Sequence, residues 1–484
     1  FIYIYINIIL KNLNNMFIKN VNKSGILYFN LSNPTVLNFD KNYNKFLICT
    51  TEILKKYKKT KINLINIYDV FHEKILNETD YDISVDQLKE LDAFFFDYAD
   101  QYLRWSFNLK LNISDIRTIY HKNIEYWLFF FKNYKIKKIY FDTAPHRAID
   151  YLAYRIAKLN NIETVIFETT NINYRVFAKP TLRPDIADLK KLNQNKKIDD
   201  IEINLEHVPG NKKIKKINFF FDEVILFAKF FFKIIFFIKR ENYLLPHSKN
   251  IFLNNFKYFI FIYNAKFKIL LYKIIYNLNC CDLKKTQKFE NDIIFYKHYQ
   301  PEATSNPLSL PMTNQEQCIS YLLKTKKNIF VKEHPTALSF NNRHFNKCLN
   351  KISDIFFYKK NGIKLINSKY SGNHICVTLS GTSGLENALL GHKVVCFSKP
   401  WYYFLPNVHV YRNKKNLELF LNDRKSYDVK EIKKQILNFI NDYTAEFKIV
   451  DTLLRGSTFL QHFSIKKKKY LLKNTLNYLK NYYN

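Results

Sequence analysis

The chain has 484 residues, of which 47% are hydrophobic and 24% are charged, so it is long enough for two or three domains and too apolar for wholesale disorder. Its formal net charge is +34, but only 11 of its 76 basic residues are arginine, and Asn, Ile, Phe and Tyr are abundant, a pattern typical of AT-rich coding. Most of the lysine is therefore expected on the solvated surface, and without a zinc finger, basic-region heptads or an RNP-type strand the sequence predicts no specific nucleic-acid partner.

The first part of the chain alternates short apolar runs with helical patterns. The runs that we interpret as strands are GILYFNL, KFLICTT, KINLINIY, DAFFFDYA, KKIYFDTA and ETVIFETT. They lack clean alternation and are rich in Ile, Phe, Tyr and Val, as in strands buried on both faces of a parallel sheet. Residues 144–160 show helical spacing between two of these runs, which predicts a βαβ unit. We predict an N-terminal Rossmann-like domain over residues 1–185.

The opening stretch FIYIYINIIL is too short to span a bilayer and lacks the flanks of a signal peptide, so we interpret it as a first strand or an upstream-extended reading frame. Residues 186–290 are predicted to form a basic linker and two aromatic helices, at 217–240 and 251–279. Basic residues interrupt every apolar run of these helices, so neither is a good transmembrane segment. They form either a buried hairpin or an amphipathic surface in the membrane interface.

A second series of strand-like runs follows in the C-terminal half. Its members are DIIFYKHY, NIFVKEHP, GIKLINS, HICVTLS, KVVCFS and VHVYR. They predict a C-terminal Rossmann-like domain over residues 291–425, followed by C-terminal helices over 426–484. The predicted fold class is α/β, with two parallel-sheet domains and a helical insertion between them. Ligands of such sheets bind at the C-terminal ends of the strands, which predicts a cleft between the domains.

Glycine is rare in this sequence, and its distribution predicts a binding loop. Four of the eight glycines lie within residues 372–391, where VTLSGTSGLENALLG indicates a strand ending at Leu379 and a helix starting near Thr382 or Ser383. Such a turn offers free N–H groups and hydroxyls to a phosphate, or it is simply a tight turn before a capped helix. The candidate phosphate-binding residues are Ser380, Gly381, Thr382, Ser383 and Gly384. Glu386 is either a capping-box carboxylate or an acceptor for sugar hydroxyls.

Two further loops are predicted at the same edge of the second sheet. In VKEHP, Lys332 and His334 can donate to a phosphate, while Pro335 ends the strand. A lone histidine in a loop is more often structural, but two loops suited to anions at one edge favour a functional site. The loop FYKHYQPEATSNPL carries His298, Gln300, Glu302 and Thr304 and follows the first strand of the second domain.

The segments HYQPEATSNPL, VKEHP and LSGTSGLENALLGHKVVCFSKPWY together resemble the capsular polysaccharide biosynthesis proteins related to the Kdo glycosyltransferases of bacterial capsule assembly. The resemblance implies a GT-B architecture in which the C-terminal domain holds the nucleotide-sugar donor. His334 and Pro335 are similar to the histidine-proline motif of enzymes that use cytidine-monophosphate-activated acidic sugars. The helix near Ser383 would bind the donor phosphate, and Glu386 would be the acid that the family carries there.

Glycosyl transfer needs a carboxylate as nucleophile or general base, which makes acidic residues at strand ends the catalytic candidates. We expect Glu302 nearest the anomeric carbon, with Glu168 or Asp142 as the acceptor-side base. His334 is expected to contribute to both donor binding and rate. The family's first domain carries an EEGY-like stretch, and the matching place here reads FETTNINYR, which keeps Glu168 and Tyr174.

The sequence, with this resemblance, thus predicts a GT-B glycosyltransferase that needs neither a metal ion nor a cofactor. Its expected substrates are a nucleotide sugar, preferably a CMP-activated Kdo or other acidic sugar, and a lipid-linked glycan acceptor. The DxD pair of Asp80 and Asp82 does not directly follow an apolar strand, so it is poorly placed for a metal. Seven cysteines without CxxC spacing are typical of a protein in the reducing cytoplasm. We expect the protein to contact the anionic inner face of the membrane peripherally and to contact capsule assembly proteins. The alternatives are a sugar-nucleotide 2-epimerase-like enzyme and a non-catalytic assembly subunit.

Overall fold

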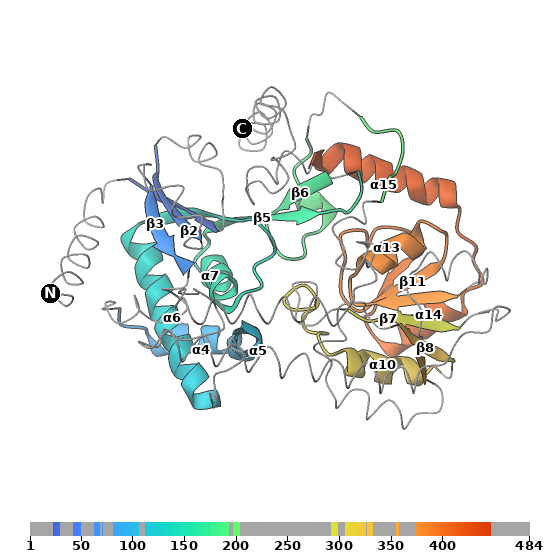
Figure 1. Cartoon of the computed structure of the whole chain (residues 1–484), viewed down its shortest axis with the longest axis horizontal. Helices are drawn as coiled ribbons and strands as arrows, with labels where there is room; N and C mark the ends of the chain where they lie inside the picture. The colour runs from blue at the N-terminus through green and yellow to red at the C-terminus, as the bar shows by residue number, and fades with distance from the viewer. Residues whose placement is uncertain are drawn as a thin grey trace, which may run out of the picture.

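The structure is a computed structural model with two α/β lobes, each built on one mainly parallel sheet (Figure 1). It describes residues 23–29, 42–49, 62–67, 70, 81–105, 112–173, 175–192, 197–203, 292–298, 305–325, 327–332, 355–357 and 374–446. The predicted aromatic helices at 217–240 and 251–279 and the opening stretch of the chain lie outside these residues. Within the described part of the chain, no helix is both long enough and apolar enough to cross a membrane.

The first sheet has the strand order β13-β6-β5-β4-β1-β2-β3. Its strands are β1 (Gly25–Phe29), β2 (Asn44–Cys49), β3 (Asn63–Asn66), β4 (Ile136–Phe141), β5 (Glu163–Thr169), β6 (Arg175–Lys179) and β13 (Ala445–Glu446). The five strands from β1 to β5 are parallel and follow the order 3-2-1-4-5 of a Rossmann sheet. β6 and β13 extend the edge as antiparallel strands.

Helices α4 (Val85–Asp92), α5 (Phe95–Trp105), α6 (Ile113–Asn133) and α7 (Ala148–Leu159) belong to this first domain. The predicted βαβ unit is confirmed, because α7 connects the parallel neighbours β4 and β5. The prediction of a strand over DAFFFDYA was wrong, since these residues form the end of α4 and the start of α5. The buried apolar side chains of α5 follow helical spacing, and they are Phe95, Tyr98, Ala99 and Tyr102.

The second sheet has the order β12-β11-β10-β7-β8-β9. Its strands are β7 (Ile293–Tyr296), β8 (Ile329–Lys332), β9 (Ile355–Phe357), β10 (Ile375–Thr378), β11 (Lys393–Cys396) and β12 (Val408–Val410). Numbered from β7, this is the 3-2-1-4-5-6 order of a complete Rossmann sheet, and all its pairings are parallel. Helices α10 (Gln315–Leu323), α13 (Thr382–Ala388), α14 (Lys414–Asn422) and α15 (Val429–Tyr443) belong to this part of the chain.

The two domains share core and backbone contacts. Ile172 and Phe177 of the first domain lie in the same buried cluster as side chains of α13 and α15. After α15 the chain returns to the first sheet, where β13 pairs with β6 (Figure 1). Part of the predicted linker is also packed, because the 3-10 helix η3 (Ile186–Asp188) and the segment 197–203 contribute apolar side chains to that cluster.

The predicted fold class is confirmed by the strand orders: the chain is α/β, with two Rossmann-like domains as a GT-B-like architecture requires. The strands β1, β7, β8 and β10 are buried along their whole length, which explains why their sequences are apolar without alternation. The point where the strand order reverses lies between β1 and β4 in the first sheet and between β7 and β10 in the second. These two points are where open α/β sheets bind ligands.

Candidate functional site

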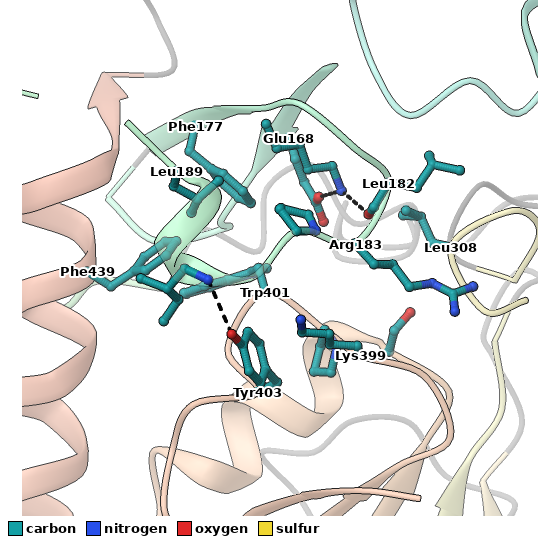
Figure 2. A pocket seen from close by; sticks show the side chains of 15 residues that line it. Glu168, Phe177, Leu182, Arg183, Leu189, Leu308, Lys399, Trp401, Tyr403 and Phe439 are labelled. Atoms are coloured by element: carbon teal, nitrogen blue, oxygen red, sulfur yellow. Dashed lines mark hydrogen bonds and ion pairs between the residues drawn. The ribbon is translucent and has the colours of Figure 1, made fainter. Parts of the chain in front are cut away.

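A pocket lies between the two domains and contains about 530 Å³ of empty space, including the part open to solvent (Figure 2). The first domain lines it with Glu168 from the end of β5 and with residues around Arg183. The second domain contributes Ser380 from the loop after β10 and Lys399 from the loop after β11. The pocket is therefore built where C-terminal strand ends of both sheets approach each other.

Glu168 is paired with Lys179, a residue that sequence reasoning missed. Glu168 lies opposite Phe177 in the β5–β6 hairpin, so Lys179 is its diagonal neighbour on the same face of the sheet. The ammonium group of Lys179 pairs with the Glu168 carboxylate and also donates to the Leu182 carbonyl at 2.7 Å. The Lys179 side chain is 3% exposed and that of Glu168 22%, so the carboxylate keeps access to the pocket.

Apolar and aromatic side chains form another wall of this pocket. Trp401 stacks on Phe439 of α15 with ring centroids 5.1 Å apart, and Phe177 meets the same ring edge-on at 5.6 Å. Tyr403 accepts a hydrogen bond from the Ile186 backbone N–H at 3.2 Å (Figure 2). The pocket thus combines ionisable groups with flat apolar surface, as small-molecule sites do.

The predicted glycine loop forms the start of α13, with Gly381 as the N-cap. A Cβ on Gly381 would lie 2.7 Å from the His298 ring, and one on Gly384 would clash with the Tyr402 hydroxyl. The Tyr402 hydroxyl donates to the Gly381 carbonyl at 2.5 Å. The two glycines therefore permit close packing of protein side chains, while Gly391 has the positive φ of 86° that favours glycine. Because Gly384 occupies the N3 position, Glu386 does not form the capping box considered above.

His298 links the two central strands of the second sheet. It follows β7, and its Nε2 lies 2.8 Å from the Thr378 hydroxyl at the end of β10 and 3.4 Å from the Ser380 N–H. Because a backbone N–H can only donate, Nε2 is the acceptor and the Thr378 hydroxyl donates to it. Gln315 accepts from the His298 backbone N–H at 2.8 Å. His298 thus lies at the reversal point of the strand order, and its signal in the sequence was its place in the polar loop after a strand.

The other predicted site residues that the structure describes lie at different places along the C-terminal edge of the second sheet. Ser380 lines the pocket, Thr382 contacts Asn171 of the first domain, and the Ser383 hydroxyl lies 3.5 Å from that of Thr378. Lys332 ends β8 and is buried, with its carbonyl accepting from the Lys297 N–H at 2.9 Å. Gln300, Glu302 and His334 lie outside the described residues, so their predicted roles stay predictions.

Asp142 follows β4 at the reversal point of the first sheet and is half-buried, but it does not line the pocket. The N-cap residue of α7 is Arg147, whose backbone N–H donates to Asp150 at 2.7 Å. The pKa of Asp150 is raised to about 7, mainly by burial; the charge of Arg147 opposes this shift and the nearby Asp142 adds to it. Among the residues that the structure describes, no group of three or more His, Cys, Asp or Glu side chains could hold a metal ion.

No protein-family model and no curated protein matches the sequence. Among solved structures, the chain is similar to the KpsC β-Kdo 2,7 transferase of Thermosulfurimonas dismutans, with 11% identity and a TM-score of 0.26 over 74% of this chain and 98% of that one. It is also similar to the UDP-GlcNAc 2-epimerase of Methanocaldococcus jannaschii, with 11% identity and a TM-score of 0.24 over 86% and 99% of the two chains. At these values the fold class rests on the strand orders described above, and no family is assigned.

Proposed function

We propose that this protein is a GT-B glycosyltransferase of surface-polysaccharide assembly that moves a sugar from a nucleotide donor to a lipid-linked glycan. The observation that supports it is one pocket lined both by Glu168, at a strand end of the first sheet, and by Ser380, beside the reversal point of the second. A transferase needs two substrates in contact, and a pocket shared by two Rossmann-like sheets suits a donor on one side and an acceptor on the other. The sequence motifs that resemble capsule Kdo transferases support a CMP-activated acidic sugar as donor.

In the proposed reaction the bond from the anomeric carbon to the donor phosphate breaks, and a bond to the acceptor hydroxyl oxygen forms. The Glu168 carboxylate, which remains accessible beside Lys179, is proposed to accept the hydroxyl proton. Lys332 and the Ser380–Ser383 turn are proposed to hold the leaving nucleotide, so that its charge is neutralised without a metal ion. Glu302 and His334 remain the further candidates for this centre.

Calorimetric titration with a panel of nucleotides, followed by a transfer assay with and without a glycan acceptor, tests this proposal. A transferase binds one nucleotide selectively and consumes its sugar donor only when the acceptor is present. Its transfer activity is expected to persist in the presence of a metal chelator. Conversion of a nucleotide sugar without acceptor would instead identify an epimerase. Absence of nucleotide binding would identify an assembly subunit. Flotation with anionic vesicles at low salt tests the proposed location on the inner membrane face, because a protein without membrane contact stays at the bottom of the gradient.

A further inference from the structure

Three cationic side chains line the interdomain pocket, and two of them are paired within the protein. Lys179 is held by the carboxylate of Glu168. Lys399 lies 2.5 Å from the carboxylate of Asp185. The third cation, Arg183, forms no ion pair with any residue that the structure describes. The pocket therefore contains one guanidinium whose charge the described protein groups leave without a direct counterion.

The hydrogen bonds of Arg183 are also incomplete. Its Nη2 donates to the Pro307 carbonyl at 3.1 Å, and its Nε is buried without an acceptor among the described residues. The pKa of the guanidinium is lowered to about 10, mainly by loss of solvation and also by the charge of Arg155, while Asp97 opposes this shift. Arg183 is thus half-buried, and its Nε lacks the acceptor that a buried guanidinium nitrogen needs.

A guanidinium presents its donors in a planar fork that matches the oxygens of a carboxylate or a phosphate. A ligand oxyanion in the pocket would supply the missing negative charge. The stacked rings of Trp401 and Phe439 line the same pocket, so the group attached to the oxyanion can lie on apolar surface. The occupant that fits this surface is a small molecule with an oxyanion beside a flat or apolar part.

We propose that Arg183 is the oxyanion-binding residue of the interdomain pocket and that it holds a phosphate or carboxylate group of the ligand. The inference rests on the proposed function for the identity of that ligand as a substrate. It concerns a residue of the first domain, so this oxyanion contact is separate from the Ser380–Ser383 turn of the second. Arg183 and Ser380 line the same pocket, one from each domain.

Arginine-specific modification with phenylglyoxal, read by peptide mass spectrometry on the full chain, tests this contact. Inorganic phosphate and acetate are the two probes, each compared with sodium chloride at equal ionic strength. A probe at ten times its Kd leaves about one tenth of the sites free, so modification of Arg183 should slow about tenfold with the anion that fits. Arg117, which is exposed and paired with Asp92, is the internal control and should react at an unchanged rate.

Calorimetric titration with the same probes gives an independent result. Arg183→Met should weaken binding of the protecting anion about tenfold or more, since charge-assisted hydrogen bonds contribute over 1.4 kcal/mol. Arg183→Lys, which keeps the charge but not the fork, should retain part of the binding, and Arg117→Met should retain all of it. Thermal unfolding of each variant checks that the fold is intact.

The proposal is overturned if neither anion changes the modification of Arg183 relative to Arg117, or if Arg183→Met binds both anions as the wild type does. Equal protection of Arg183 and Arg117 would show a general salt effect and would overturn it as well. If Arg183 binds an anion but the protein binds no nucleotide, the proposed transferase function is wrong and the proposed oxyanion site stands. If the protein binds a nucleotide but neither anion protects Arg183, the proposed oxyanion site is wrong and the proposed transferase function is unaffected.

Discussion

Asn171 of the first domain donates a hydrogen bond from its side-chain amide to the Thr382 hydroxyl of the second domain, with Nδ2 and Oγ1 3.0 Å apart. Asn171 lies in the turn between β5 and β6 and has a φ of 58°, a left-handed conformation that asparagine tolerates. Thr382 is the first residue of α13. The two domains therefore touch directly beside the turn that is proposed to hold the donor phosphate.

This contact should appear as energetic coupling between the two residues. We expect Asn171→Gly, which keeps the left-handed backbone accessible, and Thr382→Val, which keeps the side-chain shape, to show a coupling of about 1 kcal/mol in a double-mutant cycle. The measurement is the free energy of unfolding in urea for the wild type, both single variants and the double variant. Strictly additive effects would show that the bond contributes nothing to holding the domains together.

Glu168 should be needed for turnover and not for nucleotide binding. Glu168→Gln removes the proton acceptor and should lower the transfer rate by about 10²-fold or more, because loss of a general base acts on the transition state. The matched control is Glu163→Gln at the other end of β5, where Glu163 pairs with Lys138 at the protein surface. Steady-state kinetics and nucleotide titration of both variants provide the comparison, and equal turnover in the two would exclude Glu168 as the base.

The packing of Tyr402 against Gly384 predicts a specific rescue. Gly384→Ala places a methyl group against the Tyr402 hydroxyl and should destabilise the protein by roughly 1–3 kcal/mol. Tyr402→Phe removes the clashing oxygen at the expense of its hydrogen bond to Gly381, so the double variant should be more stable than the sum of the single effects predicts. Urea unfolding of the four proteins measures this, and a Gly384→Ala protein as stable as the wild type would contradict the close packing.

Asp150 should make the stability depend on pH. Burial raises its pKa in the folded protein from 3.8 to about 7, so folding favours the protonated form. Its contribution is therefore fully present below about pH 4 and is lost as the pH rises through about 7. We expect the wild type to lose on the order of 1–3 kcal/mol relative to Asp150→Asn between about pH 5 and about pH 8. Urea unfolding of both proteins at the two pH values measures the difference, and parallel pH profiles would contradict the raised pKa.

Much of the local structure could be predicted from the sequence. The runs that became β1, β7 and β10 are apolar without alternation, because strands covered on both faces meet no solvent. The start of α13 could also be placed, since a strand followed by small polar residues and glycine has few other conformations. DAFFFDYA was assigned wrongly because a short aromatic run fits a strand and a helix equally well, and only its packing decides between them.

The sequence by itself determined that the chain is α/β, that it contains two Rossmann-like halves and that polar loops follow the strands of the second half. These properties depend on the order and spacing of residues within short segments. Only the tertiary structure decided which loops meet. The antiparallel return of β6 brought Lys179 to Glu168, the strand order of the second sheet placed His298 against Thr378, and the approach of the two domains enclosed Arg183. Contacts between residues far apart in the chain depend on strand order and domain packing. Local residue patterns do not determine which distant residues come into contact.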